Sequence, residues 1–159
     1  MAVYFFDSSA LFKRYAMEAG TSWVKAITDP AAAHKIHIAQ VTLVEIVAAL
    51  ARCVREGKIS TTEAATAVSQ FRYDFDNQYI ISKLTSRIID HASTLPEIYK
   101  LRAYDAIQLA IALEVNAQSR AVGMAFLGVP ALIVVSADGD LNAAATAEGL
   151  AVDNPMNHP

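Results

Sequence analysis

The stretch Val3–Ser9, which reads VYFFDSS, sets the pattern for the whole chain. Its first four residues, Val3–Phe6, are aromatic or β-branched, which is typical of a strand that is buried on both faces. An acid, Asp7, follows directly, and the two serines after it are typical of a helix start. The stretch therefore predicts a buried strand that ends in a carboxylate.

Further strands and helices alternate along the rest of the chain. Strands are expected at Lys35–Ala39, Tyr79–Ser82, Ala131–Val135 and Ala151–Val152. Helices are expected at Ala10–Met17, Ser22–Ile27, Val41–Arg55, Ser60–Asp76, Thr85–Leu95 and Tyr104–Gln118, and a last one from Asp138 or Asp140 to Ala147. This alternation favours an α/β fold, a three-layer α/β/α sandwich around a mainly parallel central sheet. No linker or repeat divides the sequence, so we expect a single domain over residues 1–159.

Composition limits the class of protein. With 13 Lys plus Arg against 16 Asp plus Glu, the net charge is −3, which argues against binding nucleic acid through bulk positive charge alone. The one cysteine, Cys53, excludes an intrachain disulfide. The weakly polar stretch Ala121–Val135 is shorter than the roughly 20 residues of a membrane span, so we expect a cytoplasmic protein with no membrane segment.

Four acids occupy similar positions around the expected sheet. Asp7 follows the first strand, and Glu45 and Asp105 each lie near the start of a helix. Asp138 follows the strand that ends at Val135, and Asp140 is an alternative to it. Because residues beyond the carboxyl ends of parallel strands line one crevice, we expect these acids to meet there. Each acid alone also has a simpler explanation, since the helix dipole favours a carboxylate in a first turn.

Carboxylates gathered in one crevice need a cation, because they otherwise repel one another and one of them takes up a proton. Mg²⁺ binds oxygen ligands and uses only one or two protein carboxylates directly, which leaves room for water and substrate phosphate. Two such ions stabilise both the attacking and the leaving oxygen of a phosphodiester. The acids therefore predict phosphoryl chemistry, with hydrolysis as its simplest form.

The sequence resembles the PIN-domain ribonucleases, and within them the VapC toxins of toxin–antitoxin pairs. The resemblance rests on four segments in the expected order, which together cover nearly the whole chain: Val3–Leu11, Val41–Ile46, Leu101–Ala110 and Val134–Asp138 with Gly149-Leu150 and Asn154-Pro155 after it. Leu101–Ala110, which reads LRAYDAIQLA, is the most specific of them. The resemblance implies an endoribonuclease that requires Mg²⁺ or Mn²⁺, is commonly a homodimer and is held inactive by a VapB-like antitoxin.

The resemblance also assigns the site residues. The acidic quartet is Asp7, Glu45, Asp105 and Asp138, and Asp138 takes precedence over Asp140. We expect Asp7 and Asp105 to be direct metal ligands, and Glu45 and Asp138 to complete the site directly or through water. Ser8 and Ser136 are expected either to donate hydrogen bonds to the carboxylates or to act only as helix caps.

RNA also requires contacts from basic side chains. Among the candidates we select Arg14, Arg52 and Arg102, and Arg52 lies seven residues after Glu45 on the same helix face. The full set of candidates is Lys13, Arg14, Arg52, Arg55, Lys58, Lys100 and Arg102.

Three other functions fit parts of this pattern. A phosphatase of the haloacid dehalogenase type also has an aspartate after its first strand, but it usually has a second one two positions later, where this chain has Ser9. A receiver domain needs a lysine after a late strand, and no lysine follows Lys100. A non-catalytic module with a PIN fold would be expected to lose site acids, and all four are present.

Overall fold

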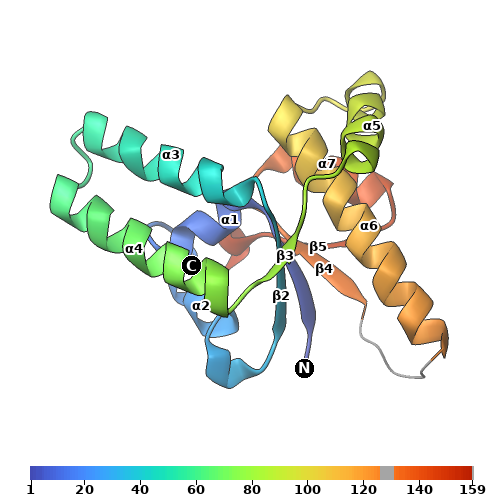
Figure 1. Cartoon of the computed structure of the whole chain (residues 1–159), viewed down its shortest axis with the longest axis horizontal. Helices are drawn as coiled ribbons and strands as arrows, with labels where there is room; N and C mark the ends of the chain where they lie inside the picture. Colours follow the sequence, from blue (N-terminus) through green and yellow to red (C-terminus); the bar gives the residue numbers. More distant parts are fainter. Residues whose placement is uncertain (126–130, 159) are drawn as a thin grey trace.

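A five-stranded sheet forms the centre of the computed structural model, which describes residues 1–125 and 131–158 (Figure 1). Its strand order is β3-β2-β1-β4-β5, and every neighbouring pair is parallel. The strands are β1 (Val3–Phe6), β2 (Lys35–Ala39), β3 (Ile80–Ser82), β4 (Leu132–Val135) and β5 (Ala151–Asp153). The expected parallel α/β fold is therefore confirmed.

Helices connect the strands and cover the two faces of the sheet. The α-helices are α1 (Ser8–Leu11), α2 (Thr21–Ile27), α3 (Thr42–Arg55), α4 (Thr61–Asn77), α5 (Ser86–Thr94), α6 (Ala103–Ala125) and α7 (Gly139–Ala147). Short 3-10 helices lie at Phe12–Arg14, Pro30–Ala32, Leu95–Glu97 and Pro155–Asn157. In Figure 1, α3 and α4 run side by side on one side of the sheet, and α5, α6 and α7 lie on the other.

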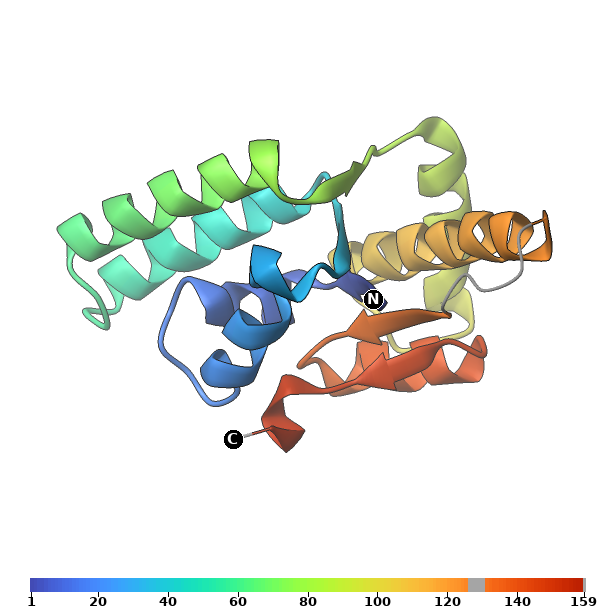
Figure 2. The ribbon, with the colours of Figure 1, turned by 90° about the horizontal axis from the view of Figure 1, so that it is seen from below.

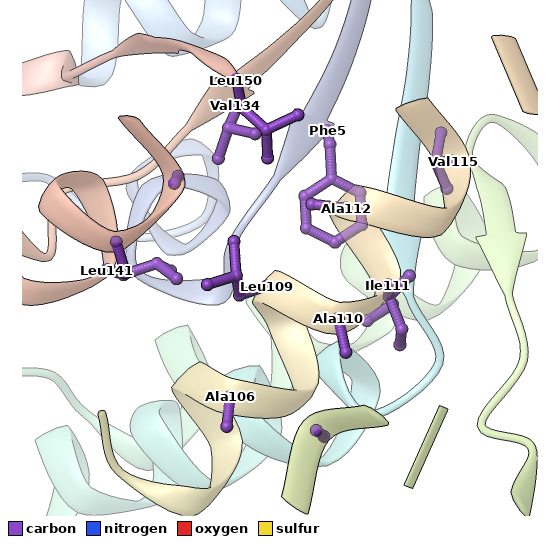
Figure 3. Packing of buried hydrophobic residues seen from close by; sticks show 14 of the residues in the cluster. Phe5, Ala106, Leu109, Ala110, Ile111, Ala112, Val115, Val134, Leu141 and Leu150 are labelled. Carbon is purple, nitrogen blue, oxygen red and sulfur yellow. The ribbon is translucent and has the colours of Figure 1, made fainter. Parts of the chain in front are cut away.

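The side chains of β1 alternate between the two faces of the sheet, and each face has its own part of the hydrophobic core. Phe5 is 1% exposed and packs with residues of α5, α6 and α7, including Leu109 and Leu141 (Figure 3). Phe6 is fully buried in the opposite cluster, with Ile46 of α3 and Phe71 of α4. Because successive side chains of a strand point to opposite faces, one aromatic pair anchors both helical layers.

The strand order changes direction at β1. The chain proceeds from β1 outward to β2 and β3, and later returns to the other side of β1 for β4 and β5. The neighbouring strands β1 and β4 therefore end next to each other at the topological switch point, where open α/β sheets bind ligands. The hydrogen bonding continues one residue further, because the Asp7 N–H donates to the Val135 carbonyl at 3.0 Å.

The first helix differs from its prediction over Ala10–Met17. It covers only Ser8–Leu11 and continues as the 3-10 helix Phe12–Arg14. Its N-cap is Asp7, whose side chain accepts a hydrogen bond from the Ser9 N–H, so neither serine is the cap. A carboxylate is a strong acceptor for the free N–H groups of a first turn, which explains why Asp7, and not a serine, caps this helix.

Gly20 and helix α2, which follows it, pack against the C-terminal turn. Gly20 has φ of +84°, and a Cβ there would lie 2.5 Å from the Pro155 carbonyl oxygen, so a larger residue would displace the C-terminal turn. Figure 2 shows this turn beside the segment that contains α2, where Trp23 and His158 stack with ring centroids 4.2 Å apart. Close approach and left-handed backbone together require glycine at this position.

Part of the stretch Ala121–Val135, residues 126–130, lies outside the described residues. Before them, α6 runs on to Ala125, beyond the expected end at Gln118, and after them β4 starts at Leu132. In residues 1–125 and 131–158, none of the helices has the combination of length and apolar character that crossing a bilayer demands.

Candidate active site

Asp7 lies at the bottom of the candidate site, at the end of β1, and is only 3% exposed. Its Oδ2 accepts hydrogen bonds from the Ser9 N–H at 3.0 Å, the Ser9 hydroxyl at 2.5 Å and the Ser136 hydroxyl at 3.1 Å. Burial raises the pKa of the Asp7 carboxyl, and these hydrogen bonds oppose the increase only in part. In the described part of the chain, no Lys, Arg or His side chain forms an ion pair with Asp7.

Serine hydroxyls join the ends of β1 and β4 around this carboxylate. Ser9 Oγ lies 3.3 Å from Ser136 Oγ and accepts a hydrogen bond from the Ala137 N–H at 3.0 Å. Ser136 is fully buried, and its hydroxyl oxygen accepts from the Asp138 N–H at 3.0 Å. The hydroxyls thus fix the position of Asp7 relative to the segment that carries Asp138.

Glu45 lies in the first turn of α3, directly after β2. The Gln108 side chain, which is 1% exposed on α6, donates from Nε2 to Glu45 Oε2 at 2.7 Å and to the Thr42 hydroxyl at 3.0 Å. Burial, and after it the charge of nearby Asp7, raise the pKa of Glu45 to about 7. A carboxyl group with this pKa is partly protonated at neutral pH unless a cation approaches it.

Asp105 and Asp138 form the outer part of the site. Asp105 lies in the first turn of α6, and Asp138 is the N-cap of α7, where its Oδ1 accepts from the Leu141 N–H at 3.0 Å. The Arg102 guanidinium bridges the two acids, with Nε 3.1 Å from Asp105 Oδ2 and Nη2 3.2 Å from Asp138 Oδ2. The helix starts therefore present both carboxylates to the same side chain.

All four predicted acids line one cleft of about 850 Å³. They come from four separate segments, and Ser8 and Ser9 line the same cleft. Asp140 is not among the lining residues, and its Oδ2 pairs with Lys100 Nζ at 3.0 Å. The geometry thus places Asp138, and not Asp140, in the cleft with the other acids.

The chemistry of these donors suits a hard divalent cation. The cleft offers carboxylate oxygens, and its deepest carboxylate is buried without a cation of its own. Within residues 1–125 and 131–158, no three His, Cys, Asp or Glu side chains are grouped closely enough to hold a metal ion by themselves. Mg²⁺ commonly takes one or two protein carboxylates directly and completes its octahedron with water and substrate.

The predicted RNA-binding arginines are not all in this cleft. Arg52 and Arg102 line it, and so do Arg55 at the end of α3 and Lys58 in the turn after it. Arg14 lies elsewhere: its Nε pairs with the buried Asp74 at 3.3 Å, and its Nη2 donates to Gln78 Oε1 at 3.0 Å. We therefore correct the expectation for Arg14, since a guanidinium committed to an internal carboxylate is not available to a phosphate.

Sequence reasoning missed Ser9 and Gln108. The serines after Asp7 indicate a helix start, and nothing local shows that the Ser9 hydroxyl makes a 2.5 Å hydrogen bond to Asp7. Gln108 lies three residues after Asp105, a spacing that puts both side chains on the same face of a helix. It is the one polar residue of the stretch Ala106–Leu113, and that feature could have identified it.

Comparison with known proteins agrees with this architecture. A family model described as the PIN domain matches residues 4–147. Ribonucleases VapC45 and VapC49, both from Mycobacterium tuberculosis, are each 31% identical to this chain over 152 residues, which is 96% of the chain and 95% of the relative. The chain therefore belongs to the PIN-domain family, alongside VapC ribonucleases.

Solved structures share the fold at much lower identity. PAE2754 from Pyrobaculum aerophilum is 15% identical with a TM-score of 0.66, and the match covers 99% of this chain and 92% of that one. VapC20 of Mycobacterium tuberculosis, a toxin that cleaves the sarcin–ricin loop, is 16% identical with a TM-score of 0.62, over 89% of this chain and 94% of that one. At these identities the likeness concerns the fold alone.

Proposed function

We propose that this protein is a divalent-metal-dependent endoribonuclease of the VapC type, with one nuclease domain over residues 1–159. The observation that carries the proposal is the cleft itself. Four acids from separate segments meet at the strand switch point, and the most buried of them, Asp7, has no basic partner among the described residues. Membership of the PIN family leaves the phosphatase and receiver-domain alternatives without support.

In this proposal Asp7 and Asp105 hold Mg²⁺ or Mn²⁺ directly, and Glu45 and Asp138 complete the site directly or through water. Ser9 and Ser136 keep the Asp7 carboxylate in place, and Gln108 does the same for Glu45. The bound cation lowers the pKa of water and neutralises charge on the scissile phosphate. Ser8 donates only a long hydrogen bond of 3.4 Å to Asp7 Oδ1, so we assign it a smaller role in orienting that carboxylate.

The RNA backbone is proposed to run along α3. Glu45 and Arg52 are two helical turns apart, which is about 10 Å, and both line the cleft. Arg55, one turn beyond Arg52, continues the basic side of the cleft, and in the described part of the chain neither arginine forms an ion pair. Phosphates on either side of the cleaved bond would contact these side chains.

Cleavage of bulk bacterial RNA with and without metal tests the proposal. The wild-type protein is expected to cleave with Mg²⁺ or Mn²⁺ and to stop in excess EDTA. Asp7→Asn is expected to lose about 100-fold or more of the rate, since even residues that only orient metal ligands are worth about 10–100-fold. The exposed α5 residue Asp90 provides the control, and Asp90→Asn should keep the wild-type rate. Full cleavage in EDTA, or by Asp7→Asn, would contradict the metal site.

The toxin role and its partner belong to the same proposal. Relatives in complex include FitAB bound to a DNA fragment, and VapBC2 of Rickettsia felis bound to promoter DNA. We infer that a VapB-like antitoxin, encoded next to this protein, occupies the acidic cleft. A cytoplasmic location and a homodimer remain predictions. Expression of the protein alone should arrest growth, co-expression of the neighbouring small protein should relieve the arrest, and harmless expression of active nuclease would contradict the toxin role.

A further inference from the structure

Arg102 occupies the position in the outer cleft where a cation is needed. Its Nε–H and its backbone N–H both donate to Asp105 Oδ2, each at 3.1 Å. Its Nη2 donates to Asp138 Oδ2 at 3.2 Å. One guanidinium thereby offsets part of the charge of two of the four site acids and joins the start of α6 to the start of α7.

The Arg102 bridge between Asp105 and Asp138 is exposed enough for a competing cation to break it. The two carboxylates are held by their helices, with side chains 15% and 24% exposed, whereas the Arg102 side chain is 82% exposed. Apart from these two acids, no side chain in the described ranges accepts a hydrogen bond from the guanidinium. Exposed ion pairs are weak, so a divalent cation that binds both carboxylates would displace the guanidinium from them.

We propose that Arg102 is a positioning residue with two alternative sets of partners. In the metal-free protein it bridges Asp105 and Asp138 and competes with the divalent cation for them. Once the cation binds, the guanidinium is released toward the RNA phosphate at the mouth of the cleft. The same planar fork of donors fits carboxylates and phosphates, so one side chain serves both states. This inference rests on the proposed function and concerns the regulation of that same site.

Binding of Mn²⁺ in the absence of RNA, followed by electron paramagnetic resonance, tests the competition. Arg102→Ala should bind Mn²⁺ roughly threefold to tenfold more tightly than wild type, the range that two exposed ion pairs are worth. Arg102→Lys should lie between them, because a lysine ammonium does not form the bidentate bridge. The matched control is Lys100→Ala, which removes the same charge from the same loop but releases Asp140; its affinity should stay within about twofold of wild type.

The release of the side chain has a direct readout in the wild-type protein. In nuclear magnetic resonance spectra, the Arg102 Nε–Hε signal, assigned by its absence in Arg102→Lys, should be protected from exchange with water before Mg²⁺ is added and lose that protection afterwards. With saturating Mn²⁺, Arg102→Ala should raise the KM for bulk bacterial RNA about threefold or more, as expected for one lost phosphate contact, and leave kcat within about twofold.

The outcomes separate this inference from the function on which it rests. Wild-type protein that binds Mn²⁺ and cleaves RNA, with Arg102→Ala and Lys100→Ala equal in Mn²⁺ affinity, would overturn the role of Arg102 alone. A protected Nε–Hε signal at saturating Mg²⁺ would do the same. Wild-type protein that neither binds Mn²⁺ nor cleaves RNA would overturn both proposals.

Discussion

Two aspartates in this molecule are equally buried, and their surroundings are opposite. Asp7 and Asp74 are each 3% exposed. The Asp74 carboxylate faces the Arg14 guanidinium at 3.3 Å and accepts hydrogen bonds from Tyr15 and Gln70, each at 2.8 Å. Asp7 receives only serine hydroxyls and a backbone N–H.

The difference separates an acid that is paired with a cation inside the protein from one that, among the described residues, is not. A buried carboxylate with its own cation is already compensated, and around Asp74 the arginine also bonds to the Thr28 carbonyl and to Gln78. That network fastens the end of α4 to the helices near α2. A buried carboxylate without a cation lowers stability until a ligand supplies the charge. Burial alone therefore does not identify a site; burial without a counter-charge does.

Removing the charge of Asp74 should have the largest effect on folding. Asp74→Asn leaves the Arg14 guanidinium without its partner, and we expect the free energy of unfolding to fall by about 3 kcal/mol, as for other broken buried pairs. RNA cleavage at a temperature where the variant is folded should be unchanged. Urea unfolding measures the first effect, with the exposed Asp76→Asn, two residues along α4, as control. Loss of cleavage in folded Asp74→Asn would show that the two aspartates are not separate in role.

The site acids should make the metal-free protein less stable as pH rises. The folded state keeps the Glu45 proton up to about pH 7, whereas the unfolded chain releases it near 4.5. Between these values the unfolded chain binds fewer protons, so stability falls with increasing pH. Water screens this half-buried side chain, and we expect a decrease of about 1–2 kcal/mol from pH 5 to pH 8 in EDTA. The raised pKa of Asp7 acts in the same direction.

Chemical unfolding at several pH values in EDTA measures this effect. Glu45→Gln should flatten the profile, and Mg²⁺ should stabilise the wild type more at pH 8 than at pH 5, because the cation competes with protons. A metal-free profile that rises from pH 5 to pH 8 would contradict the assignment of uncompensated acids to the cleft.

The smallest effect is expected at Tyr15. Its hydroxyl donates to Asp74 at 2.8 Å and lies 2.5 Å from the Tyr79 hydroxyl. Tyr15→Phe removes the bond to Asp74, which keeps its ion pair with Arg14, and the bond with the Tyr79 hydroxyl. We expect this to cost about 1 kcal/mol of unfolding free energy with no change in cleavage. Tyr73→Phe is the matched control, because Tyr73 lies next to Asp74 on α4 but its side chain is 65% exposed. A loss as large as that of Asp74→Asn would mean that Tyr15, and not Arg14, provides the main compensation.

The sequence predicted the fold and the positions of the site acids because both depend on local patterns. The run Val3–Phe6 forms β1, and Asp7 follows it at the end of the sheet, as expected. The pairing of Arg14 with Asp74 could not be predicted, since nothing near either residue indicates a partner 60 positions away. Asp74 lies in a helix with other charged residues, where an exposed side chain is the usual expectation.

Side-chain contacts within the cleft could not be predicted from local sequence patterns either. The hydrogen bond from Gln108 to Glu45 joins α6 to α3, and the position of Asp138 in the cleft depends on how the start of α7 lies against the other segments. The short first helix has a different cause. Its N-cap is Asp7, which is also a predicted metal ligand. Because the carboxylate of Asp7 caps the helix, the helix begins directly after it, at Ser8.

The order of the strands in the chain has a consequence for synthesis on the ribosome. Val3 pairs with Leu132, so β1 is synthesised long before the neighbour that completes its side of the sheet. Pairings this distant in sequence form late. A nascent chain that ends before β4 already carries Asp7 and Glu45, but it lacks Ser136 and Asp138. The cleft that the four acids line is therefore complete only after β4 has been synthesised and has paired with β1.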